Sequence, residues 1–198
     1  MIIAEAGVNH NGRMDLAKRL VDAASTAGAD FIKFQAFRSE HLVTGSLDKA
    51  HYQKKSGSSS ESQYEMLKRL ELSQDELTEL FIYCSKKKIG FMASAFDEES
   101  LRFILDMDVE YLKVPSGEIT NIPYLRIVGR KNKKVILSTG MSDISEIQMA
   151  VKVLRKSGLA KKNLTILHCN TEYPTDFSDV NLNAMKTIES KFQTKVGY

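Results

Sequence analysis

The fold class is decided by the first apolar run and the turn that follows it, Ile2-Ile3-Ala4-Glu5-Ala6-Gly7-Val8-Asn9-His10-Asn11-Gly12. Ile2–Ala6 is too short for a helix, and its apolar character predicts a buried strand. A parallel sheet that begins in this way belongs either to a doubly wound open sheet or to a (β/α)8 barrel. Gly7 and Gly12 do not have the spacing of the dinucleotide-binding fingerprint, which argues against the open sheet.

Short apolar runs alternate with helical periods along the rest of the chain. We predict seven strands: Ile2–Ala6, Asp30–Gln35, Gly90–Ser94, Tyr111–Val114, Val135–Ser138, Leu164–Cys169 and Lys195 to the end. The third run is less typical of a strand, because Met92 and Ala93 are not β-branched. Strand–helix alternation of this kind predicts a parallel sheet with crossover helices.

The segments between the predicted strands have the apolar spacing of amphipathic helices. One stripe consists of Ile144, Ile147, Val151 and Leu154, with Ser142 or Asp143 as the cap and Gly158 at the end. Ser73 and Glu76 form a capping box before another helix. A further stripe consists of Leu16, Leu20, Ala23, Ala24 and Ala27, and Gly28 ends it.

Because polar residues follow nearly every predicted strand, we expect a (β/α)8 TIM barrel whose chemistry lies at the carboxyl ends of the strands. The chain reaches only the seventh strand, so we expect one catalytic barrel domain over residues 1–198, truncated after about seven strands. About 25 residues separate Gln35 from the helix near Tyr64, including the run Ser56–Ser60. A connection of this length is either functional or a flexible linker.

The composition excludes several classes of protein. The net charge of +3, from 28 basic and 25 acidic residues, gives no electrostatic reason to expect nucleic-acid binding. The two cysteines, Cys84 and Cys169, form neither a disulfide framework nor a zinc motif. The chain has no charged-then-apolar leader and no apolar run of membrane-spanning length. We therefore expect a cytoplasmic enzyme or binding protein that does not contact a membrane.

The polar residues at the predicted strand ends form a pattern. They are Glu5, Lys33, Gln35, Ser94, Lys113, Ser116, Glu118, Ser138, His168 and Asn170. A charged residue inside a short apolar strand is costly unless it is paired or binds something, and Lys33 and Lys113 both lie in such strands. Two lysines and several hydroxyls predict an anion site, most naturally for phosphate. Glu5 and Glu118 are then candidates for acid–base catalysis or for sugar binding.

Each of these residues also has a purely structural interpretation. A strand lysine can pair with a glutamate of the neighbouring strand, and Ser116-Gly117 can be a tight turn. His168 and Cys169 are more typical of interior packing than of catalysis. The residues alone leave two reaction classes open. One is Schiff-base aldol chemistry on a barrel lysine, and the other is condensation of a phosphorylated enol.

At these residues the sequence resembles the N-acetylneuraminate (sialic acid) synthase family. The matching stretches are Ile3–Gly12, Lys33-Phe34-Gln35, Lys113-Val114-Pro115-Ser116-Gly117-Glu118, Leu137-Ser138-Thr139-Gly140-Met141 and Leu167-His168-Cys169-Asn170-Thr171-Glu172-Tyr173-Pro174. They follow the family's order and extend over essentially the whole chain. The resemblance is specific because the motifs occur together.

The resemblance implies a transferase that condenses phosphoenolpyruvate with an N-acetylhexosamine-type aldehyde. The products are a nine-carbon 2-keto-3-deoxy acid and phosphate. The aldehyde would be N-acetylmannosamine or a 2,4-diacetamido-6-deoxy sugar, and the latter leads to a legionaminic-type acid. Within the family, the resemblance points to the legionaminic-acid or spore-coat polysaccharide branch. By position, Glu5 and Glu118 would be catalytic, and the substrates would contact Lys33, Gln35, Ser94, Lys113, Ser116, Ser138, Asn170, Thr171 and Tyr173. The alternatives are a Schiff-base aldolase and a non-catalytic barrel that binds a sugar phosphate.

The resemblance also implies a divalent metal, Mn²⁺ or Mg²⁺, whose histidine ligands would follow residue 198. For this reason we assign no metal ligand within the chain, and His10, His41, His51 and His168 are left out of the metal site. The family's C-terminal antifreeze-like domain, which reaches across a homodimer, is absent from residues 1–198. We therefore expect this fragment alone to be inactive.

Overall fold

The computed structural model describes residues 1–43, 62–172 and 174–198. The chain divides into two compact units, Met1–Val109 and Glu110–Tyr198, and each is described by itself. The predicted long connection lies largely at 44–61, outside the described residues.

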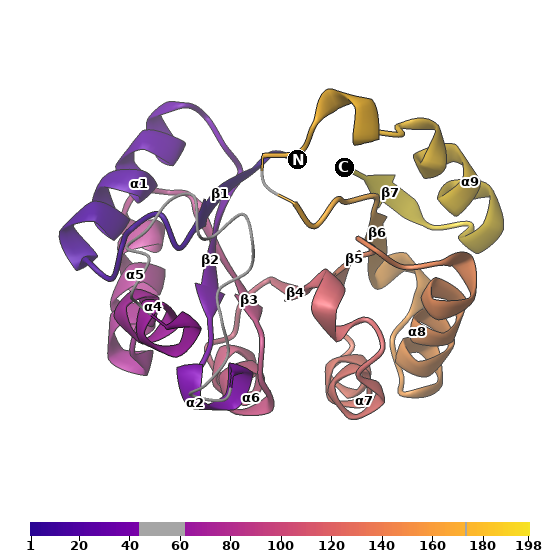
Figure 1. Ribbon diagram of the computed structural model, residues 1–198, viewed down its shortest axis with the longest axis horizontal. Coiled ribbons are helices and arrows are strands. Elements are labelled where there is room, and N and C mark those ends of the chain that lie inside the picture. Colours follow the sequence, from indigo (N-terminus) through magenta and orange to yellow (C-terminus); the bar gives the residue numbers. More distant parts are fainter. Residues whose placement is uncertain (44–61, 173) are drawn as a thin grey trace. The chain divides into compact units, whose positions relative to one another are not determined.

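The first unit contains three parallel strands, β1 (Ile3–Gly7), β2 (Phe31–Ala36) and β3 (Gly90–Ala95). Strand β2 lies between the other two. The helices of this unit are α1 (Met14–Thr26), α2 (Ser39–Leu42), α4 (Gln63–Leu70), α5 (Gln74–Lys86) and α6 (Glu98–Asp106). Helices α1 and α5 contact each other, and α5 and α6 both contact β3 (Figure 1).

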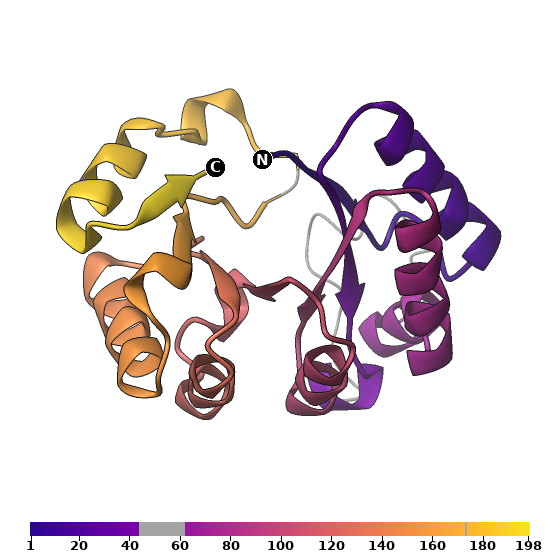
Figure 2. The same cartoon turned by 180° about the vertical axis from the view of Figure 1, so that it is seen from behind.

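The second unit contains four parallel strands, β4 (Tyr111–Val114), β5 (Lys134–Ser138), β6 (Leu164–Leu167) and β7 (Lys195–Gly197). Each pairs with its neighbour in sequence. The helices are α7 (Ile122–Arg130), α8 (Ile144–Lys156) and α9 (Asn183–Phe192), with 3-10 turns at Ser116–Glu118, Lys161–Asn163 and Phe177–Asp179. Figure 2 shows α7 and α8 side by side, in agreement with their contacts.

The helix boundaries follow local rules that the sequence reveals. Ser73 and Glu76 form the predicted capping box of α5, and Asp143 with Glu146 forms another at the start of α8. Gly28 follows α1 with a φ of 76°, a conformation that favours glycine, and so ends the helix as expected. The predicted strand at Gly90–Ser94 is confirmed as β3.

Two predictions from the sequence, the end of one strand and the buried face of one helix, are wrong in detail. Strand β6 ends at Leu167 rather than Cys169, because the pairing with β7 stops soon after Leu167 meets Gly197. The buried face of α1 consists of Ala17, Val21 and Ala24, whereas Ala23 is exposed. Small apolar side chains fall on both faces of this helix, so their pattern does not fix which face packs on the strands.

Large apolar side chains fill the interior of each unit. In the first unit Ile32, Phe34, Leu80 and Met92 are almost fully buried. In the second unit the most buried side chains include Leu112, Leu125, Ile136, Leu154 and Ile166. The predicted α/β architecture with seven parallel strands is confirmed. Among the described residues no helix is both long and apolar enough to cross a membrane.

Candidate active site

The predicted site residues lie at or near the carboxyl ends of the strands, where parallel α/β folds place their chemistry. They form one group in each unit. Glu5, Lys33, Gln35 and Ser94 belong to the first unit, and Lys113, Ser116, Glu118, Ser138, Asn170 and Thr171 belong to the second. Tyr173 lies outside the described residues.

Glu5 and Lys33 form an ion pair across β1 and β2. The two residues are register partners, and Lys33 Nζ lies 2.5 Å from Glu5 Oε2. The Lys33 side chain is 13% exposed and that of Glu5 is 50% exposed. This is the pairing that the structural interpretation of a strand lysine predicts. The half-exposed carboxylate nevertheless leaves Glu5 open to solvent and to a ligand.

Gln35 and Ser94 are register partners on β2 and β3, and Ser94 is buried. The register between β1 and β2 shifts between Glu5 and Gly7. Gly7 has a φ of 52°, and a Cβ there would lie 3.2 Å from Glu5 Oε1 and 3.8 Å from Gln35 Nε2. Gly7 thus allows the polar ends of the Glu5 and Gln35 side chains to lie close to its backbone.

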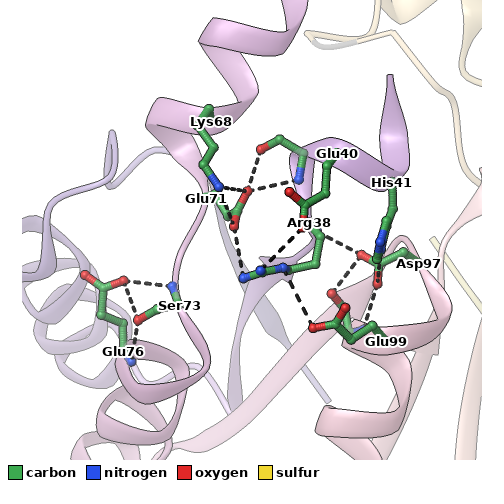
Figure 3. Close-up of polar contacts among 11 residues, drawn as sticks. Arg38, Glu40, His41, Lys68, Glu71, Ser73, Glu76, Asp97 and Glu99 are labelled. Atoms are coloured by element: carbon green, nitrogen blue, oxygen red, sulfur yellow. Dashed lines mark hydrogen bonds and ion pairs between the residues drawn. The ribbon is translucent and has the colours of Figure 1, made fainter. Parts of the chain in front are cut away.

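Sequence reasoning missed a polar network next to this group, centred on Arg38, which follows β2 (Figure 3). Arg38 Nη1 lies 3.4 Å from Glu71 Oε1, and its other nitrogens lie within ion-pair distance of Glu40 and Glu99. The Glu71 carboxylate is 8% exposed and accepts hydrogen bonds from the backbone N–H and the hydroxyl of Ser39. These contacts connect α2 to the segment between α4 and α5.

Asp97 performs a similar function at the end of β3. Its side chain accepts a hydrogen bond from the Arg38 backbone N–H at 2.9 Å and from the Ser100 backbone N–H at 2.8 Å, so it also caps α6. His41 Nδ1 lies 3.7 Å from Asp97 Oδ1. The sequence could have indicated Asp97, because it follows a predicted strand. It gives no signal for the contact between Glu71 and Ser39, which lie 32 residues apart.

In the second unit, Lys113 and two serines form the centre of the group. Lys113 is 8% exposed, and its Nζ donates a hydrogen bond to the Val114 carbonyl. Ser116 Oγ accepts a hydrogen bond from the Gly140 backbone N–H at 2.9 Å. Ser138 Oγ lies 3.3 Å from Cys169 Sγ. A buried ammonium group and two serine hydroxyls in one unit are groups of the kind that bind an anion.

Gly140 lies where three loops of this unit meet. A Cβ at this position would lie 2.7 Å from Thr171 Cγ2, 2.9 Å from Ser116 Oγ and 3.2 Å from the Cys169 carbonyl oxygen. Contacts below about 3.0 Å would force these groups apart, so the loops after β4, β5 and β6 pack this closely only around a glycine.

The remaining predicted residues of the second unit lie at the edges of the group. Glu118 accepts a hydrogen bond from Asn121 Nδ2 at 2.7 Å, and Asn121 is the N-cap of α7. Asn170 Nδ2 donates to the Asp179 carbonyl at 3.2 Å. The side-chain oxygen of Asn170 is buried without a hydrogen-bond partner in the described part of the chain.

The histidines do not assemble into a metal site in the part of the chain that the structure describes. No group of three or more His, Cys, Asp or Glu residues there is placed to hold an ion. His10 is fully buried and accepts a hydrogen bond from the Gly12 N–H through Nδ1. Burial lowers its pKa, although the charge of Glu76 and the Gly7 carbonyl act in the opposite direction. His168 stacks obliquely against Tyr198, and His51 lies outside the described residues.

A surface groove of the second unit lies away from these residues. Its lining includes Lys161, Lys162, Glu189 and Lys195, which come before or at the start of β6 and β7. It is therefore at the amino ends of these strands and contains none of the predicted site residues.

The structure thus brings four predicted residues together in the first unit and six in the second, while their roles remain predictions. Each group by itself contains a lysine, at least one serine hydroxyl and a carboxylate. Groups of these kinds can neutralise an anion and move a proton on a polar substrate.

Comparisons with known proteins give consistent results. Residues 20–198 match the model of the NeuB family. The whole chain is 46% identical to N,N'-diacetyllegionaminic acid synthases of Campylobacter jejuni and Legionella pneumophila, covering 59% and 56% of those proteins. The crystal structure of the N-acetylneuraminic acid (sialic acid) synthetase of Leptospira borgpetersenii superposes with a TM-score of 0.84 at 36% identity, over 100% of this chain and 63% of that one. The chain therefore spans somewhat more than half the length of these relatives.

Proposed function

The chain belongs to the NeuB family, and from this premise we propose that the complete protein is a synthase of the sialic acid type. It condenses phosphoenolpyruvate with an amino-sugar aldehyde and releases a nine-carbon 2-keto-3-deoxy acid and phosphate. The observation that carries the proposal is the buried Lys113 of β4, in the same unit as the hydroxyls of Ser116 and Ser138, in a chain whose relatives are named as such synthases.

The proposed sugar is a 2,4-diacetamido-6-deoxy aldose, which would make the product a legionaminic-type acid. The chain is 46% identical to two relatives named N,N'-diacetyllegionaminic acid synthase and 31–32% identical to three named N-acetylneuraminate-9-phosphate synthase. N-acetylmannosamine remains the second candidate.

In the proposed reaction, carbon 3 of phosphoenolpyruvate attacks the aldehyde carbon, and a new C–C bond forms. Water adds at carbon 2, the C–O bond to phosphate breaks, and inorganic phosphate leaves as carbon 2 becomes a ketone. As the resemblance to the family implies, the residues proposed to hold the phosphate and carboxylate of phosphoenolpyruvate are Lys33 and Ser94 of the first unit and Lys113, Ser116 and Ser138 of the second. Gln35, the register partner of Ser94, the amide of Asn170 and the hydroxyl of Thr171 are proposed to contact the substrates.

Two carboxylates carry the proposed proton transfers. Glu5 is half exposed and paired with Lys33, which suits a group that handles water or a proton at the reacting carbon. Glu118 is oriented by a hydrogen bond from Asn121 and is proposed to bind the reacting end of the sugar. Tyr173 is proposed to contact the sugar as well.

The proposal for the complete protein includes a divalent metal, Mn²⁺ or Mg²⁺, and a homodimer. When bound, such an ion polarises an aldehyde as a Lewis acid. The described residues supply no cluster of ligands for it, so we assign none of the steps above to a metal.

The test is phosphate release by the complete protein with Mn²⁺ and phosphoenolpyruvate, with the two sugars offered in parallel. Release with the diacetamido sugar, and much slower release with N-acetylmannosamine, is the expected result. The reverse preference would overturn the proposed sugar. No release with either, from a folded protein, would overturn the synthase.

The same protein distinguishes the aldolase alternative. Lys33 lies in an ion pair with Glu5, and an ammonium group held in this way is not a nucleophile. Treatment with pyruvate and borohydride is therefore expected to leave both Lys33 and Lys113 unmodified. A covalent adduct on either lysine would favour the aldolase.

A further inference from the structure

We propose that Cys169 is a positioning residue of the phosphoenolpyruvate site, because its thiol orients the Ser138 hydroxyl as a hydrogen-bond donor to the bound anion. This inference rests on the proposed function, and it concerns a residue that sequence reasoning treated as packing.

The contact that carries the inference lies at the carboxyl ends of β5 and β6. Ser138 is the last residue of β5 and is 4% exposed, and its Oγ lies 3.3 Å from Cys169 Sγ. Cys169 follows two residues after the end of β6 and is half-buried. A buried hydroxyl needs a hydrogen-bond partner, and the thiol supplies one for Ser138.

The neighbouring serine shows how such a partner sets the direction of a hydroxyl. Ser116 Oγ accepts a hydrogen bond from the Gly140 backbone N–H, a group that can only donate. The hydroxyl proton of Ser116 is therefore free to point elsewhere. An anion accepts hydrogen bonds and never donates them, so Ser116 is ready to donate to one.

The contact with Cys169 can leave the Ser138 hydroxyl in the same state, accepting one hydrogen bond and free to donate another. A hydroxyl and a thiol can each donate or accept, so either proton can occupy the contact between them. If the Ser138 proton turns to an anion, the hydroxyl oxygen can still accept the thiol proton of Cys169. The Ser138 hydroxyl thus keeps a hydrogen bond to the thiol while it donates its own proton to the ligand.

The next residue along the chain has a polar atom without a partner at this end of β6. The side-chain oxygen of Asn170 is buried and has no hydrogen-bond partner among the residues that the structure describes. Lys113, two strands away in the same unit, brings a buried positive charge. Cys169 therefore belongs to the same unit as this charge and follows the same strand end as Asn170.

The chain contains its own control for thiol chemistry. Its only other cysteine, Cys84, is fully buried in α5, and burial raises its pKa to about 12. A thiolate is the reactive species in alkylation, so Cys84 should not react in the folded protein. When the complete folded protein is alkylated, the label within residues 1–198 should therefore be on Cys169, which is half-buried.

The first experiment is alkylation of the complete protein with iodoacetamide, with and without phosphoenolpyruvate, followed by peptide mass spectrometry. We expect Cys169 to be labelled in the free protein and to be labelled several-fold more slowly with saturating phosphoenolpyruvate. Cys169→Ser should show no labelling between residues 1 and 198, which verifies that Cys84 is protected. Equal rates with and without phosphoenolpyruvate would contradict the placement of Cys169 at the site.

The second experiment measures phosphoenolpyruvate binding by calorimetry and the steady-state constants of two variants. Loss of one modest hydrogen bond predicts a rise of about three- to tenfold in Kd and KM for phosphoenolpyruvate in Cys169→Ala. The kcat and the KM for the sugar should change little. Cys169→Ser keeps a donor of similar size, so it should bind phosphoenolpyruvate within about twofold of the unaltered protein.

The outcomes separate this inference from the proposed function. Binding by Cys169→Ala equal to that of the unaltered protein, or equal weakening by Ala and Ser, would overturn the positioning role while the synthase stands. Failure of the unaltered protein to bind phosphoenolpyruvate would overturn the proposed function, and the inference with it. Binding without turnover of any sugar would overturn only the proposed reaction.

Discussion

At the scale of single residues, the predicted site residues of each unit are polar groups whose neighbours fix their orientation. Lys33 pairs with Glu5, Ser116 accepts from the Gly140 N–H, and Glu118 accepts from the capping Asn121. The partners of Lys33 and Ser116 come from a neighbouring strand or the turn after it, whereas Asn121 lies three residues after Glu118 at the start of α7. The orientation of these groups is thus set before a substrate binds, which lowers the entropy lost on binding.

Replacing Lys33 should weaken the binding of phosphoenolpyruvate. Lys33→Met removes a positive charge that is 13% exposed, and hydrogen bonds to charged groups contribute about 1.5–3 kcal/mol. We therefore expect Kd to rise roughly 10- to 100-fold by calorimetry.

A matched control for Lys33 is available in the second unit. Lys134 pairs with Glu110 at 2.6 Å, but it begins β5 and lies at the amino end of that strand. Lys134→Met should leave phosphoenolpyruvate binding unchanged. If both variants bound equally weakly, general loss of positive charge rather than a local site would explain the result.

Gly140→Ala should damage the anion site by crowding it. The added Cβ would lie within 3 Å of both Ser116 Oγ and Thr171 Cγ2, so the loops must move apart and the bond from Gly140 to Ser116 must stretch. We expect Kd for phosphoenolpyruvate to rise at least about tenfold, consistent with the cost of overpacking.

Gly117→Ala is the corresponding control, because a Cβ at Gly117 would meet no atom within 4 Å outside its chain neighbours. Binding by this variant should stay within about twofold of the unaltered protein. Calorimetry measures phosphoenolpyruvate binding by both variants, and thermal unfolding checks their stability. Equal weakening of binding in both variants would show that crowding at Gly140 does not cause it.

At the scale of elements, a buried carboxylate connects the two short helices that flank residues 44–61. Glu71 receives both hydrogen bonds of Ser39, at the start of α2, and lies 3.3 Å from Lys68 of α4. Asp97 adds a bond from the end of β2 to α6. The strand ends that carry Gln35 and Ser94 are therefore held by side chains outside the predicted site.

The stability contributed by Glu71 should depend on pH. Burial alone would raise the pKa of Glu71, but the hydrogen bonds from Ser39 and Lys68 outweigh burial and lower it. A carboxyl group whose folded pKa is lowered stabilises the fold above its unfolded pKa of about 4.3, and the benefit is lost as pH falls through the folded pKa. Glu71→Gln should thus lower the free energy of unfolding by about 1–3 kcal/mol at pH 7, and by less below about pH 4.

Thermal unfolding of Glu71→Gln at pH 7 and at pH 3.5 tests this expectation. The control is Glu99→Gln, because Glu99 is 48% exposed and lies 3.8 Å from Arg38. An exposed pair of this kind contributes about 0–1 kcal/mol. A loss for Glu71→Gln that is the same at both pH values would mean that its charge does not matter.

At the scale of the whole molecule, the proposed anion-binding groups lie within residues 1–198, and the described residues provide no metal cluster. Removal of the metal should therefore stop turnover without preventing the binding of phosphoenolpyruvate. We expect dialysis of the complete protein against EDTA to abolish phosphate release while phosphoenolpyruvate still slows the alkylation of Cys169. Restoring Mn²⁺ should restore release. Loss of that protection on chelation would instead show that the metal helps to hold phosphoenolpyruvate.

Several features follow from the sequence by itself, because they depend on local chemistry. The alternation of apolar runs and helical stripes predicted seven parallel strands, and the structure confirms them. The capping box of Ser73 and Glu76 and the glycine after α1 are confirmed for the same reason. Lys113 and Ser138, which we predicted at strand ends, lie there in the structure, whereas Lys33 lies inside β2.

Other features required the tertiary structure, because they join residues that are far apart in the chain. Ser138 meets Cys169 across 31 residues, and Ser39 meets Glu71 across 32, with no periodic pattern to link them. The end of β6 and the buried face of α1 were misjudged because pairing and packing partners decide them, not intrinsic propensity. Sequence determines which side chains line the strand ends, and packing alone determines which of them touch.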